Sequence, residues 1–205
     1  MGNQQLHNQD NPCPQKSISD RKFVIFDLDG TLIDSFECVL RCVNKALRYY
    51  NLTMFSHRTS FSYKNLNKLL NLENNVFNCN IKNKFDEFHE SDYIESTHII
   101  ESSARLLKEY CEENVSIVIV TNKKETIAKK CLSYFFPSYS FLLIGRTGIT
   151  AIKNDHQLVK ARLNELGCNT TDIIAYYGDS EEDAVLASHL QINFNKIRNC
   201  NENYL

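Results

Sequence analysis

An apolar run that ends in two closely spaced carboxylates constrains this chain more than any other feature of its sequence. Residues 23–26 are aromatic or β-branched, with no polar residue between them, which is typical of a strand buried on both faces of a parallel sheet. Asp27 and Asp29 lie two apart on an extended backbone, so their carboxylates project to the same side. Two like charges this close repel each other unless a cation holds them, and Mg²⁺ prefers such oxygen ligands. Gly30 then lets the chain turn away sharply.

The size and composition of the chain exclude several classes of protein. Its 205 residues give room for one core domain and a modest insertion. The 23 Lys and Arg residues are balanced by 25 Asp and Glu residues, which is not the charge pattern of a nucleic-acid-binding protein. No apolar run approaches the ~20 residues of a membrane-spanning helix. None of the eight cysteines forms a C-x-x-C pair, so we expect free thiols and a cytoplasmic protein.

Apolar periodicity predicts buried strands that alternate with amphipathic helices. Strands are predicted at residues 22–27, 115–121, 141–144 and 173–177, with a weak fifth at 191–194. Helices are predicted at residues 35–51, 99–113, 125–134, 155–166 and 181–188. This alternation implies right-handed crossovers and an α/β fold with a Rossmann-like, doubly wound parallel sheet.

These elements divide the chain into three parts. Residues 1–20 are polar and rich in Asn and Gln, so they are predicted to be a disordered tail. Residues 21–35 and 97–205 are predicted to form the Rossmann-like core. Residues 36–96 are rich in Asn, with short apolar clusters and a helix expected to begin near residue 84. We interpret this middle part as a small helical insertion.

Polar side chains follow the predicted strands at the edge of the sheet where ligands bind in folds of this type. A hydroxyl, a lysine and several carboxylates at one edge suit phosphoryl transfer, in which positioning and charge stabilisation dominate. A plain acidic turn is the alternative for an isolated Asp-x-Asp, but the flanking strand and the glycine after it favour a site. The residues are Asp27, Asp29 and Thr31, then Thr121 and Asn122, then Lys153, and finally residues 178–183.

The chemistry of these side chains suggests their roles. Asp27 would attack phosphorus and form an aspartyl-phosphate, and Asp29 would protonate the leaving oxygen and then activate water. Mg²⁺ would bridge Asp27, Asp179 and a phosphate oxygen. Thr121 and Lys153 would hold the phosphoryl oxygens and offset charge in the transition state.

These segments resemble the motifs of the haloacid dehalogenase-like hydrolase superfamily, in particular its phosphoglycolate phosphatase-like branch. The first motif is similar to Asp27-Leu-Asp-Gly-Thr-Leu-Ile-Asp-Ser35, the second to Ile119-Val-Thr-Asn-Lys123, and the fourth to Gly178-Asp-Ser-Glu-Glu-Asp183. The resemblance implies a Rossmann-like core, a helical cap inserted after the first motif, and Mg²⁺-dependent phosphatase activity on a small phosphorylated metabolite. It places the metal at Asp27, the backbone carbonyl of Asp29, and Asp179, with Asp183 as a ligand or in support. It places the substrate near Gly30, Thr31 and Asn122.

Two departures from the family pattern leave alternatives open. The motif lysine is commonly followed by proline, whereas Lys153 is followed by Asn154. Its place before a predicted helix favours it over Lys160, with Lys123 and Lys124 as weaker rivals. The cap region is short and rich in Asn, which weakens any transfer of substrate specificity. A phosphomutase of the β-phosphoglucomutase type and a catalytically weak binding or regulatory protein therefore remain alternatives, and a monomer and a homodimer both fit.

Two residues near the predicted site have a simpler structural explanation. Asp183 fits a capping box with Ser180 at the start of a helix, a role that can coexist with one at the metal site. Ser35 is a plausible N-cap of the helix that follows it, so we leave it out of the predicted site. Arg146 follows the third strand and is a candidate neighbour of the active site, with no motif around it.

Overall fold

The computed structural model describes residues 21–55, 76–148 and 150–197. The predicted tail at residues 1–20 and the apolar clusters near residues 66–72 lie outside these ranges. No helix within the described ranges is long and apolar enough to cross a membrane.

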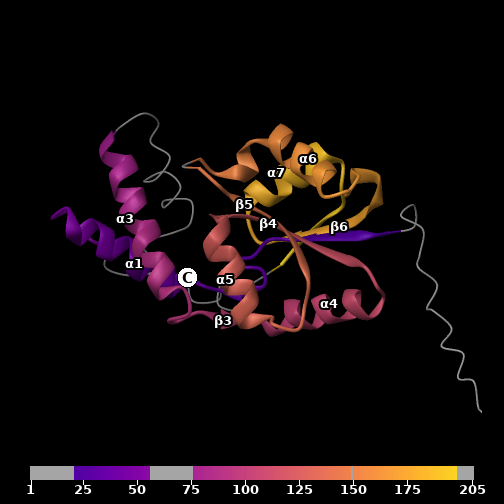
Figure 1. The fold of residues 1–205 in the computed structure, drawn as a ribbon, viewed down its shortest axis with the longest axis horizontal. Coiled ribbons are helices and arrows are strands. Elements are labelled where there is room, and N and C mark those ends of the chain that lie inside the picture. The colour runs from indigo at the N-terminus through magenta and orange to yellow at the C-terminus, as the bar shows by residue number, and fades with distance from the viewer. Residues whose placement is uncertain (1–20, 56–75, 149, 198–205) are drawn as a thin grey trace, which may run out of the picture.

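The core is a five-stranded, entirely parallel sheet (Figure 1). The strand order is β5-β4-β1-β6-β7, so the first strand lies in the centre and the chain winds outward in both directions. The predicted doubly wound α/β fold is therefore confirmed. The strands are β1 (Phe23–Phe26), β4 (Ser116–Lys124), β5 (Phe141–Arg146), β6 (Ile173–Gly178) and β7 (Phe194–Lys196).

Helices cover both faces of the sheet, as Figure 1 shows. One face packs against α6 (His156–Glu165) and α7 (Glu181–Leu190). The other packs against α4 (Glu101–Glu112) and α5 (Glu125–Phe135). Along β1, Phe23 and Ile25 enter the first layer, while the residues between and after them enter the second. Burial on both faces is the physical reason for the unbroken apolar run.

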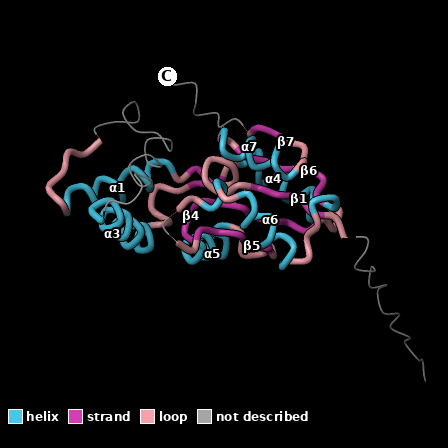
Figure 2. The backbone as a smooth tube through the Cα atoms, turned by 90° about the horizontal axis from the view of Figure 1, so that it is seen from above, coloured by secondary structure: helices cyan, strands magenta, loops and turns pink. Residues whose placement is uncertain are grey.

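A second body of helices lies beside the sheet (Figure 2). Within the described residues it comprises α1 (Phe36–Tyr49) and α3 (Val76–Asp92), which bury an apolar cluster of their own. A short antiparallel ribbon of β2 (Ile33–Asp34) and β3 (His98–Ile99) joins the two ends of this insertion. Lys45 and Arg41 of α1 form ion pairs with Asp92 of α3. The arrangement is what we expect of an inserted cap, whose limits at residues 36 and 96 stay a prediction.

Three boundaries differ from those predicted by three residues or more. The last strand begins at Phe194 rather than at residue 191, because Gln191 adopts a left-handed conformation (φ 58°) that ends α7. Helix α3 begins at Val76, well before residue 84, since packing of Ile81 and Phe85 against α1 overrides the weak helix propensity of Asn. Strand β4 continues to Lys124 across a register shift against β5.

Candidate active site

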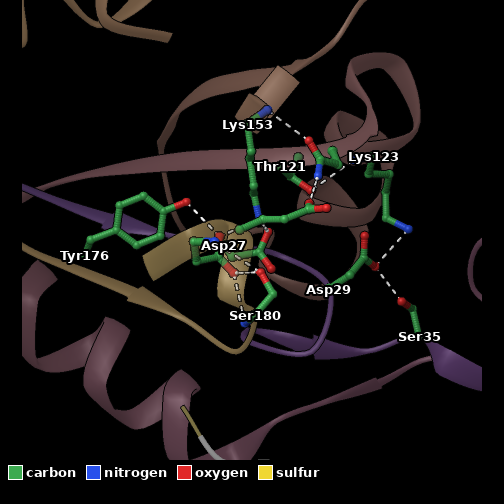
Figure 3. Close-up of polar contacts among 11 residues, drawn as sticks. Asp27, Asp29, Ser35, Thr121, Lys123, Lys153, Tyr176 and Ser180 are labelled. Atoms are coloured by element: carbon green, nitrogen blue, oxygen red, sulfur yellow. Dashed lines mark hydrogen bonds and ion pairs between the residues drawn. The ribbon is translucent and has the colours of Figure 1, made fainter. Parts of the chain in front are cut away.

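A buried lysine joins two carboxylates at the carboxyl end of β1 (Figure 3). The Nζ atom of Lys153 lies 2.6 Å from Oδ1 of Asp27 and 2.6 Å from Oδ1 of Asp183. All three side chains are almost fully buried. Lys153 belongs to a short 3₁₀ helix (Ile152–Asn154), and its backbone N–H donates to the Asn122 side chain at 3.0 Å. Lys160, by contrast, is exposed on α6.

Both carboxylate oxygens of Asp183 accept hydrogen bonds from protein groups. The Tyr176 hydroxyl donates to its Oδ1 at 2.8 Å, the atom that also contacts Lys153. The hydroxyl and backbone N–H of Ser180 donate to its Oδ2 at 2.5 and 3.1 Å. The predicted capping box at the start of α7 is therefore present. Because its lone pairs are occupied in this way, Asp183 suits the support of Lys153 better than direct coordination of a cation.

The carboxylates outnumber the ammonium group that neutralises them. Oxygen atoms of Asp27, Asp179 and Asp183 all lie within 4.8 Å of one another. Burial raises the pKa of the Asp27 carboxyl well above its usual range; Lys153 opposes this shift, whereas Asp183 and Asp179 reinforce it. Burial likewise raises the pKa of Asp179 to about 6, with Lys153 again opposing and Asp183 reinforcing. This uncompensated negative charge and all-oxygen donor set fit a hard divalent cation such as Mg²⁺.

Gly30 allows Asp179 to approach the end of β1. Its φ of +81° is left-handed, and a Cβ atom built on it would lie 2.3 Å from Oδ2 of Asp179. No side chain fits in that space, so the first motif needs a glycine here to bring the first and fourth motifs together.

Asp29 has partners of its own. The Nζ atom of Lys123 lies 2.9 Å from its Oδ1, and the Ser35 hydroxyl donates to the same atom (Figure 3). Ser35 occupies the predicted N-cap position of α1, but its side chain makes no capping hydrogen bond. Its hydroxyl binds Asp29 instead, a contact that the sequence did not predict. The two contacts fix the orientation of the Asp29 carboxylate and leave its second oxygen, Oδ2, out of both interactions.

A cavity of about 430 Å³ opens onto these groups. Asp27, Asp29, Thr121, Asn122 and Lys153 line it, together with Asp179 and residues 180–182. The structure thus brings together the predicted residues from four strand ends. Gly30, Thr31 and Asp183 do not belong to the lining. The Thr31 side chain is fully buried, and its hydroxyl has no hydrogen-bond partner within the described ranges.

A comparison with known protein families identifies the family of this chain. Residues 24–197 match the model of the haloacid dehalogenase-like hydrolases. The chain belongs to this family. The resemblance inferred from the motifs is therefore confirmed, and with it the prediction that the chain is an enzyme of hydrolase type.

Individual members of the family resemble the chain over most of its length. The phosphoglycolate phosphatase of Cereibacter sphaeroides is 26% identical over 182 residues, which are 83% of this chain and 82% of that protein. The structure of CbbY from Rhodobacter sphaeroides in complex with phosphate has a TM-score of 0.69 at 15% identity, covering 85% of this chain and 84% of that one. A haloacid dehalogenase-like family hydrolase from Streptococcus pneumoniae has a TM-score of 0.69 at 14% identity, covering 88% and 86%. At such identities the structures show a shared fold.

Lys82, His89 and His156 of this hydrolase line the cavity although the sequence did not assign them to it, and Arg146, the candidate neighbour of the site, lines it too. Lys82 and His89 come from α3, and Arg146 ends β5. His89 Nε2 lies 3.1 Å from Lys123 Nζ; burial, helped by Lys123 and Arg146, lowers the pKa of the imidazole well below its usual range. Lys82 and His89 lie seven residues apart, which places them on one face of a helix. This spacing was the signal in the sequence that could have assigned both residues to the cavity. The surrounding Asn residues obscured it.

Proposed function

We propose that this hydrolase is a Mg²⁺-dependent phosphatase of a small phosphorylated metabolite and that it works through an aspartyl-phosphate on Asp27. The observation that carries the proposal is the placement of Lys153 against Asp27, with Asp179 beside them and a cavity in front. The likeness to a phosphoglycolate phosphatase supports a phosphomonoester of similar size. The described cysteines are all free, which supports a reducing, cytoplasmic location.

The proposed reaction has two steps, and Asp27 and Asp29 have different roles in them. The Asp27 carboxylate forms a bond to phosphorus while the bond from phosphorus to the leaving oxygen breaks, and Asp29 gives that oxygen its proton. Water then attacks the phosphorus of the acyl phosphate, Asp29 takes a proton from it, and inorganic phosphate leaves as Asp27 is regenerated. Thr121 and Lys153 hold the phosphoryl oxygens and offset their charge throughout.

Asp27, Asp179 and the backbone carbonyl of Asp29 would hold the metal, with Asp183 in support. When bound, Mg²⁺ supplies the positive charge that lets an anionic nucleophile meet an anionic phosphoryl group. Lys153 remains the protein's own cation beside Asp27.

Hydrolysis of p-nitrophenyl phosphate tests the proposal directly. We expect release of p-nitrophenol with Mg²⁺, loss of activity with excess chelator, and recovery when Mg²⁺ is restored. A panel of phosphorylated metabolites then ranks the substrates. Failure of Mg²⁺ to produce hydrolysis of any of these compounds would contradict the proposal, and a requirement for a sugar bisphosphate would favour the phosphomutase instead.

Replacing Gly30 by alanine is expected to separate Asp179 from the other carboxylates. The new Cβ would overlap Asp179, so that side chain must move. We expect affinity for Mg²⁺ to fall roughly 10- to 100-fold, and the free energy of unfolding to fall by about 1–3 kcal/mol because of the left-handed backbone. Calorimetric titration with Mg²⁺ and urea unfolding measure the two effects.

Gly167→Ala is the matched control for Gly30→Ala. Gly167 also has a positive φ, +73°, but a Cβ atom there would meet nothing within 4 Å. We expect this variant to lose stability through backbone strain alone and to keep its affinity for Mg²⁺. Equal affinities for Mg²⁺ in wild type, Gly30→Ala and Gly167→Ala would show that the position of Asp179 does not depend on Gly30.

A further inference from the structure

Lys82 is a buried cation at the cavity, and no carboxylate in the described part of the chain forms an ion pair with it. Its side chain comes from α3, is 5% exposed and lines the cavity. Within the described ranges it makes neither a hydrogen bond nor an ion pair. An isolated charge removed from water is costly, and proteins retain one where it has a binding partner or a functional use.

The other cations of the cavity are already neutralised. Lys153 contacts Asp27 and Asp183, and Lys123 contacts Asp29. The Nζ atom of Lys124 lies 3.7 Å from Glu90. Lys82 therefore differs from the other lysines of the lining, because no carboxylate in the described part of the chain forms an ion pair with it.

Arg146 increases the positive charge around Lys82 rather than relieving it. Its guanidinium donates to Asp86 at 2.7 Å and to the backbone oxygen of Asn122 at 3.0 Å. Arg146 therefore pairs with the same carboxylate that acts electrostatically on Lys82. Burial, with Arg146 adding to it and Asp86 opposing it, lowers the pKa of Lys82 to about 8. The amine is thus still protonated at pH 7, and Lys82, Arg146 and Asp86 together carry one unbalanced positive charge.

We propose that the substrate carries a second anionic group, a carboxylate or a phosphate, and that Lys82 binds it while the transferred phosphoryl group lies at Asp27. This inference rests on the proposed phosphatase function and narrows its substrate class to phosphomonoesters with a charged second group. The cavity then has two complementary regions. The carboxylates at the strand ends would hold the metal and the phosphoryl group, and Lys82 of α3 binds the remaining anion.

The test compares esters that differ only in their second group. These are 2-phosphoglycolate, ethane-1,2-diyl bisphosphate and 2-hydroxyethyl phosphate, which end in a carboxylate, a phosphate and a neutral hydroxyl. We expect kcat/KM for at least one anionic ester to exceed that for the neutral ester by roughly 10- to 100-fold, the range of a charge-assisted hydrogen bond. The better of the two anionic esters identifies the group that Lys82 recognises.

Lys82→Met is expected to remove most of this selectivity, chiefly through a higher KM for the anionic ester. Methionine keeps the apolar length of the side chain and removes a buried charge, so the melting temperature should not fall. Lys84→Met is the control from the same helix, because Lys84 pairs with Glu87 and does not line the cavity. The control should keep the wild-type selectivity, and an unchanged selectivity in Lys82→Met would overturn the inference.

A binding measurement separates this inference from the proposed function. In Asp27→Asn, 2-phosphoglycolate, ethane-1,2-diyl bisphosphate and 2-hydroxyethyl phosphate are titrated in a calorimeter with Mg²⁺ present. We expect an anionic ester to bind at least about 10-fold more tightly than the neutral one, and Lys82→Met in the same background to abolish the difference. If wild type hydrolyses none of the esters but this difference is found, the phosphatase proposal fails and recognition by Lys82 stands. Equal binding of all three esters overturns the recognition itself.

Discussion

Asp27→Asn is expected to abolish phosphatase turnover and to leave the fold intact. The amide has the shape of the carboxylate but cannot form the acyl phosphate, so kcat should fall by about 10⁴-fold or more, the scale seen when a nucleophile is removed. Burial and the charges of Asp183 and Asp179 already raise the pKa of Asp27, so a neutral amide relieves repulsion within the cluster. Lys153 keeps its contact with Asp183.

The measurement pairs activity with thermal unfolding. Initial rates with p-nitrophenyl phosphate and Mg²⁺ give the loss of turnover, and the melting temperature without metal should be equal to or above that of wild type. Asp172→Asn, a change of the same kind in a short 3₁₀ helix away from the cavity lining, should retain full activity. Turnover near the wild-type rate in Asp27→Asn would rule out Asp27 as the nucleophile.

Lys153→Met is expected to have the largest effect on stability. Lys153 neutralises two buried carboxylates at 2.6 Å, and removing one partner of a buried ion pair costs about 3–5 kcal/mol. Burial opposes the charge on this lysine, but Asp183 and Asp27 outweigh it and raise its pKa well above the usual range. Turnover should also fall by about 10²- to 10³-fold, since a donor to the developing phosphoryl charge is lost.

The pH dependence of the Lys153→Met variant follows from the groups left behind. Burial acts to raise the pKa of Asp183, but Lys153 and the donors Ser180 and Tyr176 hold it below the usual range. Without Lys153, the folded-state pKa values of Asp27 and Asp183 rise relative to the unfolded chain. Such groups destabilise the fold above the unfolded pKa, and protonation relieves the penalty as the pH falls through the folded pKa. The deficit relative to wild type should therefore be larger at pH 8 than at pH 5.

Urea unfolding of four proteins measures these effects without and with Mg²⁺. They are wild type, Lys153→Met, Asp183→Asn and the double variant. We expect the double variant to be more stable than the sum of the single losses predicts, because each change removes the unpaired charge that the other creates. Lys160→Met, on the exposed side of α6, serves as the control. Additive losses would show that the 2.6 Å contact contributes no coupling.

The sequence predicted the sheet well, and also the site residues at the carboxyl ends of its strands. Strand β1 was visible because both of its faces are buried, so every residue in it is apolar. The strand-end residues could be associated in advance because parallel strands bring their carboxyl ends to the same edge. Asp27, Thr121, Lys153 and Asp179 do line one cavity. Their catalytic roles stay predictions until the variants are measured.

Residues whose side chains contact a partner outside their own helix or strand were harder to place from the sequence. Ser35 has the sequence of an N-cap, but its hydroxyl turns to Asp29. Asp183 combines a capping box with the lysine contact, and sequence spacing shows only the first. The start of α3 was predicted eight residues too late, at 84 instead of 76, because local propensity carries no information on its packing against α1.

By itself, the sequence determined the α/β class, the central strand with its paired carboxylates, and the polar residues at the other strand ends. It could do so because burial and strand direction leave local patterns in the chain. Only the tertiary structure decided which charges neutralise one another and which do not. Lys82 and Asp27 lie far apart in the sequence yet line the same cavity, and the energy of a charge depends on the groups around it in space.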